Sequence, residues 1–368
     1  MSPANPPPRP PLTDEEQRLL TDPDYLAESS KKGPIVFQDR SVQDLDIQDQ
    51  RFLAVRFAGV DFQNTRLSAT AFEQAELHEV TFTACTFDDV GFERSRLERC
   101  GFDFCQMGRV RIVDATAADL TLQGCTWKDS VFERAEFQSL IDRGGSFLRS
   151  QFRNVRLVTP ELRGTRFDHA QIEDVTVAGG TLGGVTFTAA QGRGMLVQSA
   201  LVDGLDFVLG TWVALTFDQI HGRTLRLTAV STAGLSLLGC GELVGVAVAG
   251  GELAGLAIDR CPTLGLVSFG QAKIGNLMVS DSFIDGAFWQ GCTIADMSSI
   301  ERSCLAGLDL GRSSVDGLAI RDTQLTTALG LQGAQVQGLV LERVSYAPDL
   351  VVRADGLSYG PGARFPTP

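Results

Sequence analysis

The sequence predicts an all-β solenoid, a chain wound into stacked square coils, and two observations predict it. A large hydrophobic residue recurs every five positions over most of the chain, and a small or apolar residue recurs two positions before it. Neither a helix, with a period of 3.6, nor a strand, with a period of two, gives a period of five. A chain that turns a corner every five residues does, and four such steps complete one coil.

The five-residue frame runs from Phe52 to Phe187, with one skip at Ala117 and one charged member, Asp142. Its large members are Phe52, Phe57, Phe62, Leu67, Phe72, Leu77, Phe82, Phe87, Phe92, Leu97, Phe102, Met107, Ile112, Leu122, Trp127, Phe132, Phe137, Phe147, Phe152, Leu157, Leu162, Phe167, Ile172, Val177, Leu182 and Phe187. The position two residues earlier is never charged between residues 50 and 187. Charges gather at the other three positions, which indicates two inward and three outward positions in every five.

This pattern resembles that of the pentapeptide-repeat family, and the resemblance covers roughly residues 37–352. The repeats are degenerate, because the Asp or Asn that often precedes the central Leu or Phe in the family is mostly absent here, and Asp61 is a rare match. The resemblance implies a right-handed quadrilateral parallel β-helix. These residues would make about 16 coils of 20–21 residues, each packed on its neighbours.

The charged residues give an independent test of a 20-residue coil. The position two after the large residue, read every 20 residues, alternates in sign along three rows. The rows are Asp89, Arg109, Asp129, Arg149; Arg94, Asp114, Arg134, Asn154, Asp174; and Glu79, Arg99, Asp119. Stacked coils lie about 4.8 Å apart, so opposite charges of one row would face each other.

The second half of the chain keeps the rule with slips. New frames start after six-residue steps, as between Ile258 and Leu264 and between Leu325 and Leu331, which predicts some coils of 21 residues. Glycine recurs here, and it tolerates the positive φ that a sharp corner needs. These glycines are Gly245, Gly255, Gly265, Gly275, Gly286, Gly307, Gly317 and Gly338. We therefore expect a continuation of the solenoid rather than a second kind of domain.

The chain is expected to have three parts: residues 1–33, a β-helix over 34–352, and an irregular tail over 353–368. Residues 1–33 begin with a proline-rich lead. Thr13 to Glu16 matches a helix capping box, and Asp22–Pro23 can start a second short helix. This segment would either cap the open first coil, which a solenoid needs, or dock a partner.

No catalytic, cofactor-binding or metal-ligating residue is predicted. Cys85, Cys105 and Cys125 are 20 residues apart at an inward position, so we expect a stacked internal ladder of free thiols. Cys240 and Cys261 are equivalent positions of the later repeat. The chain has no Cys-x-x-Cys or Cys/His zinc spacing, and its three histidines, His78, His169 and His221, are isolated in the sequence.

Two interruptions of the frame stand out. Asp142 puts a charge at an inward position, which predicts a side chain flipped outward, a bulge or kink, or an irregularity that binds a partner. Gly192 and Val197 stand where large residues belong, and there we expect a local distortion or a small loop.

The sequence has no signal peptide pattern and no stretch approaching 18 apolar residues, so we expect no membrane span. A cytoplasmic location follows by default, and secretion by a leaderless route stays open. Nothing in the sequence forms a paired-carboxylate cleft, so an enzyme is not predicted.

The favoured function is a non-enzymatic scaffold or adaptor that binds another protein through residues 1–33 or through a solenoid face. The resemblance implies a bacterial protein, and some family members are encoded with secretion systems such as type VI or act as effectors. End-to-end stacking into a dimer also stays open.

The alternative is a DNA mimic that binds type II topoisomerase, as some members of the family do. A net charge of −13 favours a mimic of duplex phosphates, but the alternating signs oppose the long like-charged rows that a mimic needs. No basic stripe exists, so direct nucleic-acid binding is not predicted.

Overall fold

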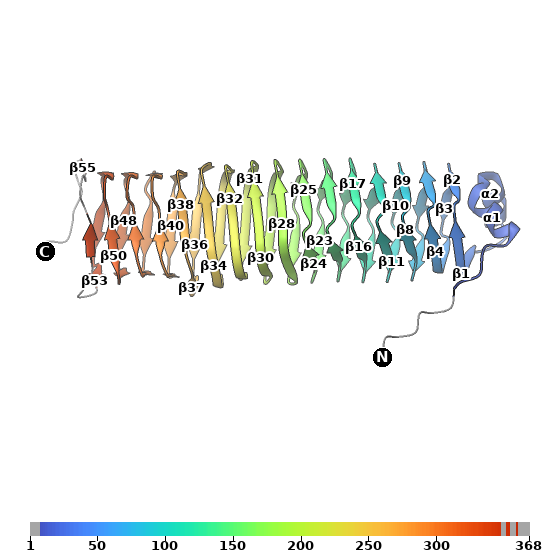
Figure 1. Ribbon diagram of the computed structural model, residues 1–368, viewed down its shortest axis with the longest axis horizontal. Helices are drawn as coiled ribbons and strands as arrows, with labels where there is room; N and C mark the ends of the chain where they lie inside the picture. Colours follow the sequence, from blue (N-terminus) through green and yellow to red (C-terminus); the bar gives the residue numbers. More distant parts are fainter. Residues whose placement is uncertain (1–7, 347–350, 354–357, 360–368) are drawn as a thin grey trace. The chain divides into compact units, whose positions relative to one another are not determined.

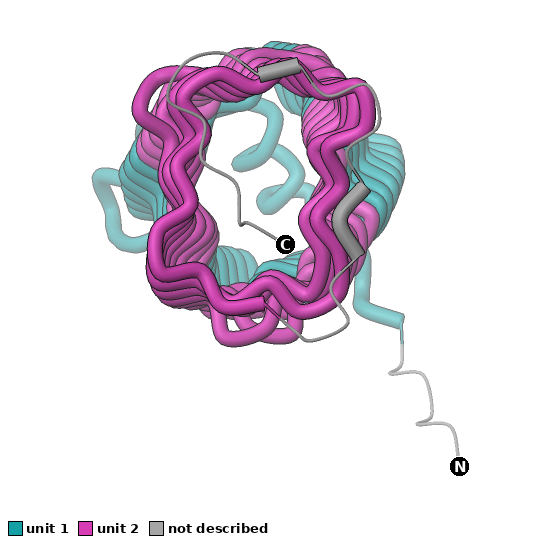
Figure 2. Tube along the Cα trace, turned by 90° about the vertical axis from the view of Figure 1, so that its left-hand side faces the viewer, with its two compact units in different colours: residues 1–171 teal, residues 172–368 magenta. Residues whose placement is uncertain are grey.

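The computed structural model describes residues 8–346, 351–353 and 358–359, and it divides into two compact units, residues 1–171 and 172–368 (Figure 2). Both units are parallel β-solenoids, as the sequence predicts, and together they contain about 16 coils. Two short helices precede the strands (Figure 1).

The strands of unit 1 follow the five-residue period. Helices α1 (Asp14–Thr21) and α2 (Pro23–Ser30) lead into β1 (Val36–Gln43), β2 (Asp46–Gln48), β3 (Arg51–Leu53) and β4 (Arg56–Gln63). From β5 (Arg66–Ser68) to β25 (Arg166–Asp168), a three-residue strand begins at every fifth residue. Strand β26 (Gln171–Glu173) contains the boundary between the units, and β27 (Thr176–Ala178) follows in unit 2.

The strand register confirms a four-sided coil of 20 residues in unit 1. Phe52 pairs with Phe72, and Phe72 pairs with Phe92, both in parallel. The inward side chains therefore lie directly over one another, and the rings of Phe72 and Phe92 stack with centroids 4.9 Å apart. Each buried large side chain contributes roughly 1.5–3 kcal/mol, so the stacked interior holds the coils together.

The corners of unit 1 are made mostly by residues other than glycine. Asp89, Arg109 and Asp129 have φ of 57°, 53° and 54° at the position two after the large residue. A left-handed conformation costs such residues about 1–2 kcal/mol. Each corner gains a hydrogen bond to the next coil, because the Asp89 N–H donates to the Gly108 carbonyl at 3.0 Å. Coil-to-coil bonding thus offsets the cost of the corner.

After β27, the strands of unit 2 become longer. From β28 (Thr181–Thr188) to β33 (Ser231–Leu238), an eight-residue strand begins at every tenth residue, and β34 (Gly241–Ala249) follows. The later strands are β35 (Glu252–Leu253), β36 (Leu256–Asp259), β37 (Thr263–Leu264), β38 (Val267–Gly270), β39 (Lys273–Gly275), β40 (Leu277–Ser280), β41 (Phe283–Ile284), β42 (Ala287–Phe288), β43 (Thr293–Ala295), β44 (Ser299–Glu301), β45 (Cys304–Leu305), β46 (Leu308–Asp309), β47 (Ser314–Asp316), β48 (Ala319–Arg321), β49 (Gln324–Leu325), β50 (Ala328–Gly330), β51 (Gln335–Gln337), β52 (Val340–Glu342), β53 (Ser345–Tyr346), β54 (Val351–Arg353) and β55 (Ser358–Tyr359).

The six-residue steps give coils of 21 residues, as predicted. Leu243 pairs with Leu264 across 21 residues, whereas Leu264 pairs with Ile284 across 20. The expectation that the recurrent glycines make corners is correct for half of them. Positive φ occurs at Gly245, Gly286, Gly317 and Gly338 and not at Gly255, Gly265, Gly275 and Gly307.

The predicted bulge at Asp142 is wrong. Asp142 stays in register on β20 (Ile141–Arg143), between Leu122 and Leu162, and its side chain is fully buried. Gly145 makes this arrangement fit, because a Cβ there would lie 2.3 Å from the Asp142 Oδ1. Because Gly145 has no side chain, the interior of the coil has room for the carboxyl group of Asp142.

The distortion predicted around Gly192 and Val197 is also wrong. Strand β29 (Gln191–Gln198) runs through both residues without a break, and Val197 is fully buried. Gly192 pairs with Trp212, and a Cβ at Gly192 would lie 2.1 Å from the indole ring. The large residue missing from one coil is replaced by the tryptophan of the next.

Part of the stretch predicted to be an irregular tail, 353–368, has a defined backbone. Arg353 ends β54, and Ser358–Tyr359 forms β55, which pairs with Gln335 and Val336 of β51. The rest of that prediction lies outside the described residues.

Candidate interaction surface

The N-terminal helices are capped as the sequence predicts. The Thr13 hydroxyl accepts a hydrogen bond from the Glu16 N–H at 3.2 Å, and Glu16 Oε2 accepts one from the Thr13 N–H at 2.8 Å. The Asp22 carboxylate accepts one from the Tyr25 N–H at 3.0 Å, which starts α2. Leu20 of α1 and Leu26 of α2 are buried.

Polar contacts hold this segment on the first coils. The Ser41 N–H of β1 donates to the Pro10 carbonyl at 2.8 Å. Arg40 donates to Glu16 at 2.8 Å, and Arg9 donates to Asp61 of β4 at 2.9 Å. Burial would raise the pKa of Glu16, but the hydrogen bonds from Arg40 and Thr13 outweigh it and lower that pKa. These contacts join the N-terminal segment to β1 and β4.

The charge rows of unit 1 form ion pairs between coils. Arg149 pairs with Asp129 at 2.7 Å, and Arg134 pairs with Asp114 at 2.6 Å. The third row contributes Arg99 to Glu79 at 3.1 Å. The expectation is corrected at two arginines, because Arg109 contacts Asp88 and Arg94 contacts Glu73 rather than a member of its own row.

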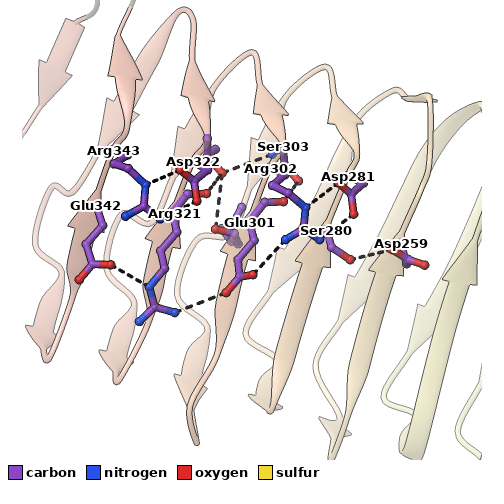
Figure 3. A network of polar contacts seen from close by, with 12 residues as sticks. Asp259, Ser280, Asp281, Glu301, Arg302, Ser303, Arg321, Asp322, Glu342 and Arg343 are labelled. Atoms are coloured by element: carbon purple, nitrogen blue, oxygen red, sulfur yellow. Dashed lines mark hydrogen bonds and ion pairs between the residues drawn. The ribbon is translucent and has the colours of Figure 1, made fainter.

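Unit 2 carries a network of the same kind (Figure 3). Arg302 contacts Asp281 at 2.7 Å and Glu301 at 3.3 Å. Arg321 then joins Glu301, at 3.4 Å, to Glu342, at 3.0 Å. Acids and arginines of successive coils therefore neutralise one another along this part of the surface.

A groove on another part of unit 2 has a different character. It encloses about 430 Å³ and runs over β42, β46 and β50. Leu266 and Phe288 form its apolar wall, with 52% and 47% of their surfaces exposed. Asp285 and Asp309 also line it. A concave apolar surface with a few charged groups is typical of a binding site.

Sequence reasoning missed this groove, although a signal was present. Phe288 precedes Trp289, and Trp289 is the fully buried member of the pair. Leu266 stands two residues after the inward Leu264. A large apolar residue at an outward position of the five-residue frame is therefore the signal to search for.

The cysteine ladder lies in the interior of unit 1, as predicted. Cys85, Cys105 and Cys125 are buried and free, and their thiols donate to backbone carbonyls of the preceding coil. Hydrogen bonds with the thiols of Cys125 and Cys85 raise the pKa of the Cys105 thiol. Burial likewise raises the pKa of Cys100 to about 11. These raised pKa values favour the unreactive protonated form of the Cys100 and Cys105 thiols.

The remaining candidate groups do not come together. His169 is exposed at a corner of unit 1, and His221 begins β32 (His221–Thr228). Within the described residues, no group of three His, Cys, Asp or Glu side chains could hold a metal ion. In the same part of the chain, no helix is long and apolar enough to cross a membrane.

Residues 55–141 match the family model described as a pentapeptide repeat region. This segment is a pentapeptide repeat region. The family that the sequence pattern indicates is thereby confirmed where the frame is most regular. No curated protein matches the sequence.

Solved structures with a similar course of the chain include three kinds of protein. A trypsin-treated form of QnrB1, a plasmid-mediated fluoroquinolone resistance protein, is 19% identical, with a TM-score of 0.34 over 49% of this chain and 92% of that protein. HetL, a pentapeptide repeat protein involved in heterocyst differentiation regulation from the cyanobacterium Nostoc sp. strain PCC 7120, is 14% identical, with a TM-score of 0.19 over 51% and 91%. A mutant of the periplasmic alginate epimerase AlgG is 10% identical, with a TM-score of 0.33 over 91% of each chain.

Proposed function

We propose that this protein is a non-enzymatic scaffold or adaptor that binds another protein through the groove of unit 2. The single observation that carries the proposal is the exposed apolar wall of Leu266 and Phe288 beside acidic side chains. Water contacts these two side chains in the free protein, and a partner that covers them gains the free energy of burying apolar surface.

In this proposal the N-terminal segment is a cap and not the docking arm. Its buried Leu20 and Leu26, together with the ion pair between Arg40 and Glu16, support that assignment. A bacterial, cytoplasmic adaptor associated with a secretion system such as type VI, or with effector delivery, is the setting we propose. That setting rests on the family resemblance alone.

The proposal is tested by crosslinking inside the organism that makes the protein. A photoreactive phenylalanine replaces Phe288 in the full chain, and a second variant carries it at Thr293, which is exposed on β43 of the same unit. We expect a discrete crosslinked partner at position 288 and none at position 293. A protein that crosslinks to nothing from either position would end the proposal.

The second candidate is a DNA mimic that inhibits type II topoisomerase, and the net charge of −13 is the observation that favours it. The paired arginines of both units weaken it, because they break the acidic surface into short neutral segments. A gyrase supercoiling assay with micromolar protein decides the matter. We expect no inhibition, and inhibition would replace the scaffold with the mimic.

A further inference from the structure

We propose that the groove of unit 2 binds an extended peptide segment of the partner in which an apolar side chain stands next to an arginine or lysine. This inference rests on the proposed function and specifies the chemistry of the partner.

The apolar half of the recognition comes from two side chains that converge. Leu266 Cδ2 and Phe288 Cε2 each lie 3.1 Å from the point where a Cβ of Gly286 would stand. Gly286 has a φ of 103°, so a side chain at this position would be strained as well as crowded. Leu266 and Phe288 therefore lie against the same stretch of bare backbone and form a continuous apolar wall.

The floor of the groove is made of small residues. Ala306, Gly307, Ala328 and Gly330 line it beside the wall. The Ala287 N–H already donates to the Gly307 carbonyl at 2.7 Å. Since the strands of the floor are paired with one another, a peptide cannot add to them as a further strand. It must bind by laying side chains against the wall and floor.

The acidic side chains of the groove favour a basic residue beside the apolar one in the bound peptide. Among the residues whose side chains the structure describes, neither Asp285 nor Asp309 has an ion pair, whereas Asp281 and Asp322 of the neighbouring network are each paired with an arginine. From the described residues, Asp309 accepts hydrogen bonds only from neutral donors, the Gln290 amide at 2.5 Å and the Gly311 N–H at 2.9 Å.

Two carboxylates thus stand beside an apolar wall, and no arginine or lysine of the described part of the chain lines the groove with them. A guanidinium or ammonium group of the peptide supplies the missing opposite charge, and a guanidinium can bind a carboxylate through two hydrogen bonds. The pairing also steers the peptide to the groove and excludes acidic segments.

The test selects peptides from a phage-displayed library of random decapeptides on the full-length protein. In parallel it uses the double variant Asp285→Asn/Asp309→Asn and a control double variant, Glu252→Gln/Asp316→Asn. The control removes two exposed acids of the same unit away from the groove. We expect sequences with Arg or Lys beside a large apolar residue, binding about tenfold more weakly to the first variant and equally well to the control.

A third variant, Leu266→Ser/Phe288→Ser, checks the apolar half. Since about half of the surface of each residue is exposed, we expect the fold to tolerate the change. We expect it to lose the selected peptides. Enrichment of sequences without a basic residue, or equal binding to wild type and the groove variants, would overturn the inference.

These failures are distinguishable from a failure of the proposed function. If the partner crosslinked from position 288 still binds the Asn and Ser variants with wild-type affinity, the scaffold function stands and the peptide chemistry is wrong. If no partner is crosslinked at all, the function itself is wrong.

Discussion

At the scale of single residues, Asp142 shows how the interior of a solenoid accepts a polar group. Its Oδ2 accepts a hydrogen bond from the Thr165 hydroxyl, while its Oδ1 has no partner among the described residues. Burial raises the pKa of this carboxyl group. The titratable group that faces it is the Cys125 thiol, which is itself buried. A neutral carboxylic acid is the form that suits this site.

This assignment predicts the pH dependence of Asp142→Asn. Because the folded pKa is raised, Asp142 contributes most to stability below its unfolded value, near 3.8, and that contribution is lost as pH rises through the folded pKa. We expect the variant to gain stability relative to wild type on going from pH 4 to pH 7. Urea unfolding at both pH values measures the difference.

An exposed acid, changed by Asp316→Asn, serves as the control and should show no such gain. If the free energies of unfolding of wild type and Asp142→Asn differ by the same amount at both pH values, the carboxyl group is charged in the fold.

Gly192→Ala tests whether the indole of Trp212 fills the space that Gly192 leaves in the neighbouring coil. The new Cβ would lie 2.1 Å from the indole of Trp212, so the ring must move, and we expect a loss of about 1–3 kcal/mol in unfolding free energy. Gly270→Ala is the matched control, because nothing lies within 4 Å of its Cβ position and its φ is not positive. Denaturant midpoints followed by tryptophan fluorescence compare the two. Equal losses would refute the packing argument.

At the scale of elements, the N-terminal helices are small and depend on their contacts with the first coil. A helix of eight residues is marginal alone in water, so α1 and α2 take their stability from packing. Leu20, fully buried on α1, is central to that packing.

Leu20→Ala should therefore weaken the packing of the two helices on the first coil. We expect the free energy that holds them there to fall by about 2–5 kcal/mol. We expect limited proteolysis to cut between α1 and β1 much faster in this variant. Glu28→Ala, at an exposed position of α2, should leave the cleavage rate unchanged. Equal protection of both variants would show that the segment is not a docked cap.

The arginine network of unit 2 is an element-scale feature with a modest effect. Arg302 is about half exposed and contacts two acids, so Arg302→Ala should cost less than about 1 kcal/mol, and high salt should remove the difference by screening. Thermal unfolding at low and high salt measures this. Arg312→Ala, an exposed corner residue with no ion pair among the described residues, is the control. A loss that persists in molar salt would require another role for Arg302.

At the scale of the whole molecule, each coil packs on its neighbours, so stability is a sum of local terms. Gly192→Ala should therefore reduce amide hydrogen-exchange protection in the coils around residues 181–230 and leave residues 60–130 unchanged. Mass spectrometry of peptic peptides reads both regions in one experiment. Loss of protection throughout the chain would show that the molecule unfolds as a single cooperative body.

Much of this architecture was predictable because the inward positions repeat. A period of five with charges confined to three positions leaves one solution, and Phe52, Phe72 and Phe92 stack as that solution requires. Thr13 and Asp22 were recognisable as helix starts because capping depends on residues only three apart.

The sequence by itself determined the coil, its 20- and 21-residue lengths, the thiol ladder and the capped helices, because each depends on a local or strictly periodic pattern. Tertiary structure alone decided the rest. Asp142 stays inside because Gly145 leaves room for it, and Gly192 needs no loop because Trp212 fills its place. The groove exists because Leu266, Phe288 and two acids from different coils lie side by side. Such arrangements depend on which side chains become neighbours across coils, and a five-residue period does not contain that information.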